Sequence, residues 1–139
     1  MKKIIKLFLL LLIAFSFSCE EHGILIDCQE CTEEEPVDAL LELSLDVFAS
    51  GTPTNIIIYE GNLEDECIYK SFSTTLKETT IRVTLNKKYT VTAEYNVSGT
   101  TYTAVDSATP RLKYNKDQCD NPCYFVYDKK VNLKLKFTK

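Results

Sequence analysis

Apolar and polar residues alternate along much of the chain, and this alternation predicts strands. A period of two is typical of a strand with one buried face and one solvated face. It appears first at residues 39–47, where the apolar positions are Leu41, Leu43, Leu45 and Val47 and the polar positions between them are Glu42, Ser44 and Asp46. It returns at residues 131–137, where Val131, Leu133, Leu135 and Phe137 alternate with Asn132, Lys134 and Lys136.

Shorter apolar runs between these two segments predict the remaining strands. They cover residues 56–59, 67–72, 81–85, 89–97, 102–105 and 124–127. The polar and largely acidic segment 60–66 is expected at the tip of a hairpin, and Ser98-Gly99 provides the turn of a second hairpin. The polar stretch from Pro110 to Pro122 is expected to be a long connection without strands.

About seven short strands with turn residues between them, and no helical period, predict an all-β fold built as an antiparallel β-sandwich. An up-and-down barrel is the alternative. A chain of 139 residues has room for a single domain. We assign residues 38–139 to the sandwich and the acidic, cysteine-containing residues 19–37 to a tether.

One predicted hairpin resembles a known family. Residues 88–95, followed by Gly99 and Tyr102, are similar to the late hairpin of transthyretin-like and carboxypeptidase-regulatory-like domains, which are Ig-like β-sandwiches of bacterial surface proteins. The resemblance implies a sandwich fold and an accessory role. It implies no catalytic site.

The first eighteen residues follow a different pattern, that of a signal peptide. Three lysines within the first six residues precede an unbroken apolar run at residues 7–15. This run is about half the length of a membrane-spanning helix. Glu20 and Glu21 follow it, where a permanent anchor would be flanked by basic residues. We therefore expect residues 1–18 to be removed.

The end of this segment, Ser16-Phe17-Ser18-Cys19, resembles the lipobox of bacterial lipoproteins. The resemblance implies that Cys19 carries diacylglycerol and further acyl chains, such as palmitate, which anchor the protein to a membrane. An ordinary secretory signal followed by an unrelated cysteine is the alternative. Glu20 and Glu21 resemble an export signal for the outer cell surface, although a solvated linker explains them equally well. We expect a lipid-anchored protein of the cell envelope, at the outer membrane and facing outward.

Charge is divided unevenly along the chain. The mature part has 13 basic and 20 acidic residues and a net charge of −7, which argues against nucleic acid or anionic lipid as a partner. Residues 19–69 contain 14 acidic residues and no Lys or Arg, whereas residues 70–139 contain 13 basic and 6 acidic residues. Opposite charges stabilise neighbouring strands. We therefore expect the first and last strands to be sheet neighbours, with Glu42 and Asp46 beside Lys134 and Lys136.

Cysteine is the residue type that carries the most chemical information. Besides Cys19 the chain contains Cys28, Cys31, Cys67, Cys119 and Cys123. Outside the cytoplasm such cysteines form disulfides by default, and the spacing alone does not choose among the possible connectivities or identify the free thiol. A bond between the close pairs Cys28/Cys31 and Cys119/Cys123 would close a loop of about 90 residues.

The same two pairs permit two other chemistries. Four thiolates from Cys28, Cys31, Cys119 and Cys123 would form a structural zinc site. A Cys-x-x-Cys motif also occurs in thiol oxidoreductases, where the environment lowers a thiol pKa. Here the motif lies among acidic residues and no βαβ pattern follows it. Both observations argue against an oxidoreductase, and we expect disulfides first. Metal binding or thiol redox chemistry at these four cysteines is the alternative function.

No catalytic constellation is found in the sequence. His22 is the only histidine and lies in the tether, which excludes triad chemistry. The acidic segment 60–66 lacks the ligand spacing of a calcium loop. Tyr89 and Tyr95 share parity with apolar residues and are expected in the core, although a sugar-stacking platform is the alternative. Asp106-Ser107-Ala108 resembles the acceptor for O-glycosylation in some Gram-negative envelopes, at Ser107.

These observations predict a non-catalytic binding or structural module on the cell envelope. We expect no cofactor and no resident metal. The partner would be a protein or a glycan that the sequence does not identify.

Overall fold

A computed structural model of the protein describes residues 26–47, 51–119 and 122–136. Within these ranges it contains nine strands and two short 3-10 helices. The elements are η2 (Cys28–Glu30), β1 (Asp38–Ser44), β2 (Thr54–Glu60), η3 (Leu63–Asp65), β3 (Ile68–Thr74), β4 (Glu78–Thr84), β5 (Tyr89–Val97), β6 (Thr100–Ala108), β7 (Arg111–Asn115), β8 (Cys123–Tyr127) and β9 (Lys130–Asn132).

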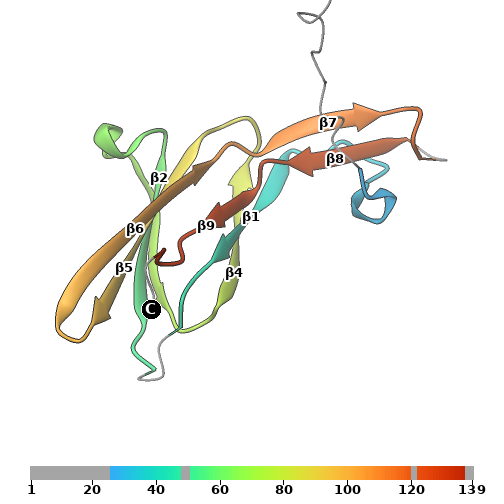
Figure 1. The fold of residues 1–139 in the computed structure, drawn as a ribbon. Helices are drawn as coiled ribbons and strands as arrows, with labels where there is room; N and C mark the ends of the chain where they lie inside the picture. The colour runs from blue at the N-terminus through green and yellow to red at the C-terminus, as the bar shows by residue number, and fades with distance from the viewer. Residues whose placement is uncertain (1–25, 48–50, 120–121, 137–139) are drawn as a thin grey trace, which may run out of the picture.

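Two sheets form the body of the molecule (Figure 1). One has the strand order β4-β1-β9 and the other the order β3-β2-β5-β6. Alternate residues of both sheets point into one core, as the period-two pattern requires. The core residues are Ala39, Leu41, Leu43, Leu45, Ile56, Ile58, Ile81, Val83, Leu85, Tyr89, Val91, Ala93, Tyr95, Ala108, Val131 and Leu133. The predicted all-β fold with antiparallel sheets is confirmed, with nine described strands in place of about seven.

Both predicted hairpins are present. β2 pairs antiparallel with β3 around the acidic tip, and β5 pairs antiparallel with β6. At the second turn Ser98 and Gly99 both have positive φ, +52° and +82°, which matches the twist of a tight two-residue hairpin. Tyr89 and Tyr95 are fully buried, as their parity predicts.

A third, two-stranded ladder of β7 and β8 projects from the sandwich (Figure 1). The prediction that residues 110–122 form a connection without strands is therefore wrong for Arg111–Asn115. The residues of β7 are mostly exposed, so burial gives the segment no alternation to detect. The strand exists because its backbone pairs with β8, in register from Arg111 opposite Tyr127 to Asn115 opposite Cys123.

The predicted proximity of the first and last strands is confirmed, although they run parallel. The predicted charge partners are wrong. Glu42 lies opposite Lys130 in the register, and its carboxylate pairs with Lys129 Nζ at 3.1 Å, so Lys134 and Lys136 are not its partners. The carboxylate of Asp46 accepts a hydrogen bond from the backbone N–H of Leu135 at 2.7 Å.

The last strand is shorter than predicted and ends at Asn132. The carboxylate of Asp46 explains the ending, because it binds the N–H of Leu135, the next donor that a longer ladder with β1 would use after that of Leu133. Asp106 Oδ2 accepts from the N–H of Asn132 at 2.7 Å, and Asp46 accepts from that of Leu135. Leu133 is nevertheless buried, and its N–H donates to the carbonyl of Ser44 at 2.9 Å.

The first strand also ends early, at Ser44, and Val47 is 44% exposed, so its predicted place on the buried face is wrong. Several predictions fall outside the described residues: the signal peptide 1–18, Cys19, Glu20, Glu21, His22 and Phe137. In the described ranges no helix has the length and apolarity needed to cross a bilayer.

Candidate functional site

Two disulfides join the N-terminal segment to the β7–β8 ladder. Cys28 is bonded to Cys119, and Cys31 is bonded to Cys123. Each bond links one member of the first close pair to one member of the second, across 91 and 92 residues. Cys67 is the free cysteine of the described ranges and is exposed. This connectivity is one of those that the sequence left open.

Local hydrogen bonds position the N-terminal segment that carries Cys28 and Cys31. The side chain of Asp27 caps η2 by accepting a hydrogen bond from the backbone N–H of Gln29 at 3.0 Å. Thr32 then forms an isolated antiparallel bridge with Tyr124, in which the two N–H groups donate to the opposite carbonyls at 3.1 and 3.0 Å. Thr32, which we assigned to the tether, thus pairs with β8.

Two ion pairs of Lys129 add to this attachment. Lys129 Nζ lies 3.4 Å from a carboxylate oxygen of Glu30 and 3.1 Å from one of Glu42. Burial acts to lower the pKa of Lys129, but the two carboxylates outweigh it and the net effect is a raised pKa. Lys129 therefore stays protonated and links Glu30 of η2 to Glu42 of β1.

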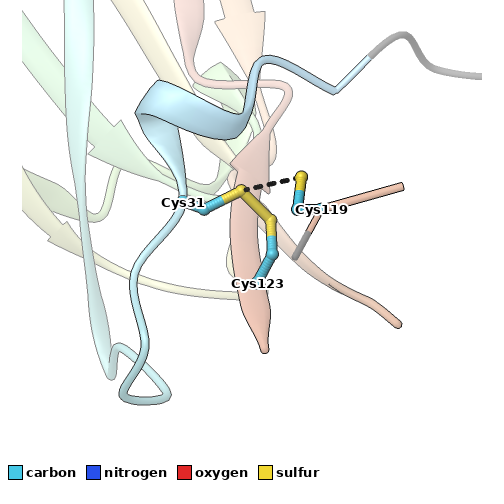
Figure 2. Close-up of side chains that lie close together, drawn as sticks. All are labelled: Cys31, Cys119 and Cys123. Carbon is cyan, nitrogen blue, oxygen red and sulfur yellow. Dashed lines mark hydrogen bonds between the residues drawn. A yellow bond between two sulfur atoms is a disulfide. The ribbon is translucent and has the colours of Figure 1, made fainter. Parts of the chain in front are cut away.

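Three of the four sulfurs form one compact group, and the fourth, Cys28 Sγ, joins it through its bond to Cys119. Cys31 Sγ lies 3.9 Å from Cys119 Sγ although the two belong to different disulfides (Figure 2). The sulfurs of Cys31, Cys119 and Cys123 all lie within 4.8 Å of one another. They border an open hollow of about 280 Å³, which the four cysteines line together with Thr32, Glu33 and Pro122.

The connectivity bears on the redox alternative. In a thiol oxidoreductase the two cysteines of Cys-x-x-Cys form a disulfide with each other, and one of them attacks the substrate as a thiolate. Here Cys28 and Cys31 are each bonded to a cysteine of the other pair. In this state neither of them has a thiolate to offer.

The acidic hairpin tip, residues 60–66, binds its own neighbours. Lys87 Nζ donates to Glu60 at 2.8 Å, and Lys88 Nζ donates to Asn62 at 2.7 Å. The hydrogen bond to Glu60 and its charge raise the pKa of Lys87. The carboxylate of Asp65 accepts from the backbone N–H of Asn62 at 2.8 Å. The tip is thus stabilised by lysines and by its own backbone.

Ser107, the predicted glycosylation residue, is exposed on β6 opposite Thr90. β6 is an edge strand, and a groove of about 500 Å³ runs between it and the segment that follows β9. Its lining includes Val105, Lys134 and Lys136. Sequence reasoning missed this groove because its two walls are about thirty residues apart in the chain and neither wall carries a motif.

Comparison with known proteins identifies no relative. No protein-family model matches the chain, and neither a curated protein nor a solved structure resembles it. The likeness to transthyretin-like and carboxypeptidase-regulatory-like domains stays a prediction.

Proposed function

We propose that the protein is a lipoprotein of the cell envelope, acylated at Cys19, whose sandwich is a non-catalytic binding or structural module. The pair of disulfides carries this proposal, because it fastens the segment that follows the anchor directly to the folded body. Disulfides of this kind persist outside the cytoplasm, which agrees with an exported protein.

The distance between anchor and body follows from the connectivity. Cys28 lies nine residues after Cys19. A fully extended chain spans at most about 3.3–3.6 Å per residue, so the first disulfide lies within about 30 Å of the membrane. The acidic tether is thus short, and the lipid and the disulfides together would hold the domain close to the bilayer.

The same arrangement orients the module. Figure 1 shows the β5–β6 turn at the opposite end of the molecule from the β7–β8 ladder and η2. With the ladder held toward the membrane, the sandwich and the groove beside β6 lie farther from it. Lys134 and Lys136 give one wall of the groove positive charge for a protein or glycan partner.

Replacement of the anchor residue tests the proposal. We expect Cys19→Ser to abolish incorporation of a labelled fatty acid and to release the protein from the membrane fraction. Cys67→Ser is the matched control, because it also removes one thiol, and it should label and fractionate as the wild type does. Persistent label on the Cys19→Ser protein would overturn the lipoprotein assignment.

Outward orientation is tested on intact cells. Protease added to the medium should digest the protein to the same extent as a known surface protein, while a periplasmic marker stays intact. If the protein survives until the outer membrane is permeabilised, it faces inward.

The groove is tested with a photo-crosslinking residue placed at Val105, which lines it and is 51% exposed. Ile68 on β3, at the opposite edge of the same sheet and 60% exposed, is the control position. We expect discrete adducts from position 105 and none from position 68. The same adducts from both positions would mean that the groove does not select the partner.

A further inference from the structure

We propose that the cysteine cluster has a second state, in which both disulfides are reduced and the four thiolates of Cys28, Cys31, Cys119 and Cys123 bind one Zn²⁺ ion. This inference goes beyond the envelope module and does not depend on acylation. It rests on the positions of the four sulfurs and of the backbone that supports them.

The sulfur geometry suits a zinc ion. Zinc in structural sites is tetrahedral, with Zn–S bonds of about 2.3 Å, so two sulfurs on one ion are about 3.8 Å apart. The sulfurs of Cys31 and Cys119, which are not bonded to each other, are already 3.9 Å apart. Cys123 Sγ lies within 4.8 Å of both, and after reduction Cys28 Sγ, which lies outside this group of three, has to move toward them to complete the four corners.

The spacing of the ligands also suits zinc. Cys28 and Cys31 are separated by two residues, and Cys119 and Cys123 by three. Structural zinc sites commonly take two such closely spaced pairs from distant parts of a chain. Four sulfur ligands favour a soft or borderline metal over calcium or magnesium, which require oxygen.

Contacts other than the disulfides hold the two sides together. The Thr32–Tyr124 bridge keeps the N-terminal segment beside β8, and Lys129 pairs with Glu30. The β7–β8 ladder fixes the chain on both sides of the Cys119 and Cys123 connection. These contacts do not involve the sulfurs, so we expect the thiols to stay close together after reduction.

The conversion needs an external reductant, for which a dithiol serves. Each protein disulfide accepts two electrons and two protons and becomes two thiols, while the dithiol becomes a disulfide. Two equivalents therefore reduce the cluster. Zinc then binds four thiolates, and the four thiol protons pass to solvent.

The test uses the full chain with Cys19→Ser, in which the anchor position offers no thiol. The protein is reduced anaerobically with a dithiol, freed of reductant and titrated with Zn²⁺ against a chromogenic chelator, with native mass spectrometry for stoichiometry. We expect one zinc per chain in the reduced protein and none in the oxidised protein. Co²⁺ should give the visible absorption of a tetrahedral thiolate site.

When Cys123→Ser is added to the Cys19→Ser protein, zinc binding should weaken at least about tenfold. Cys67→Ser added to the same protein should leave zinc binding unchanged. The four cysteines of an unfolded chain would also bind zinc. The variant Thr32→Pro distinguishes that binding from binding at a folded site. This variant keeps all four cysteines but removes the N–H that donates to Tyr124. We expect it to weaken binding too. Absence of zinc from the reduced protein, or an affinity unchanged by Cys123→Ser or by Thr32→Pro, would overturn the proposal.

Discussion

The hydroxyl of Tyr95 donates a hydrogen bond to the backbone carbonyl of Leu133 at 2.9 Å, inside the protein. Tyr95 belongs to β5 of the four-stranded sheet, and Leu133 directly follows β9 of the three-stranded sheet. The same hydroxyl accepts from the backbone N–H of Asp46, just after β1, at 3.3 Å. One buried side chain thus joins the two layers by polar contacts.

We expect Tyr95→Phe to lower the free energy of unfolding by about 1–3 kcal/mol, because it leaves a buried carbonyl and a partly buried N–H without this partner. Urea denaturation provides the measurement. Tyr114→Phe is the matched control, since Tyr114 is 46% exposed, and it should change stability by less than about 0.5 kcal/mol. Equal effects of the two variants would contradict a special role for the Tyr95 hydroxyl.

Alkaline pH should destabilise the protein through Tyr95. Burial raises the pKa of Tyr95 above that of an unfolded tyrosine, about 10, although the N–H of Asp46 partly offsets the effect. The folded state therefore holds this proton more tightly, and its contribution is complete below pH 10 and is lost as pH rises through the folded pKa. Burial raises the pKa of Tyr89 as well.

The measurement is the urea midpoint between about pH 9 and 12, in a Cys67→Ser background that removes the free thiol and so prevents disulfide exchange. We expect the midpoint to fall above pH 10 and to fall less in Tyr95→Phe. An equally steep fall in both proteins would assign the pH dependence to other groups.

The two disulfides should contribute to stability in a strongly non-additive way. Either bond alone closes a loop of more than 90 residues, and the other then closes a ring of only about nine residues. In the chain-entropy model, removal of one bond as a serine pair should cost about 2–3 kcal/mol, and removal of both about 7 kcal/mol. Urea denaturation of the paired and quadruple variants measures this. Equal first and second losses would contradict the shared loop.

A double-mutant cycle on Glu42 and Lys129 tests the charge contact between β1 and the residue that precedes β9. Lys129 is partly buried, with 21% of its side chain exposed, and also lies beside Glu30. We expect Glu42→Gln and Lys129→Met to show a coupling of up to about 1 kcal/mol that decreases as salt is added. Lys134 replaces Lys129 in the control cycle and should show no coupling with Glu42.

Side-chain parity predicted a large part of the fold. Leu41, Leu43, Leu45, Val131 and Leu133 are all buried, because a strand with one buried face must place every second residue in the core. β7 was missed because its side chains are mostly exposed and its pairing is a backbone property. The partner of Glu42 was missed because the parallel register places the chain just before β9, and not the chain after it, beside β1.

The cysteine cluster, too, was predicted from the sequence only in part. Composition and spacing identified Cys28, Cys31, Cys119 and Cys123 as the residues that matter. Their connectivity depends on how the N-terminal segment runs along β8, which the Thr32–Tyr124 bridge determines. No local sequence signal encodes a bridge between residues 92 positions apart, so the pairing required the structure.

The central claim is that two specific disulfides, Cys28–Cys119 and Cys31–Cys123, fasten the N-terminal segment to the domain. Peptide mapping of the unreduced protein, isolated from cells with its free thiols alkylated, tests it most directly. Cleavage after Glu30 separates Cys28 from Cys31, and cleavage before Asp120 separates Cys119 from Cys123. We predict linked peptides for Cys28 with Cys119 and for Cys31 with Cys123, and alkylated Cys67. A Cys28–Cys31 peptide, or four alkylated cysteines, would contradict the account.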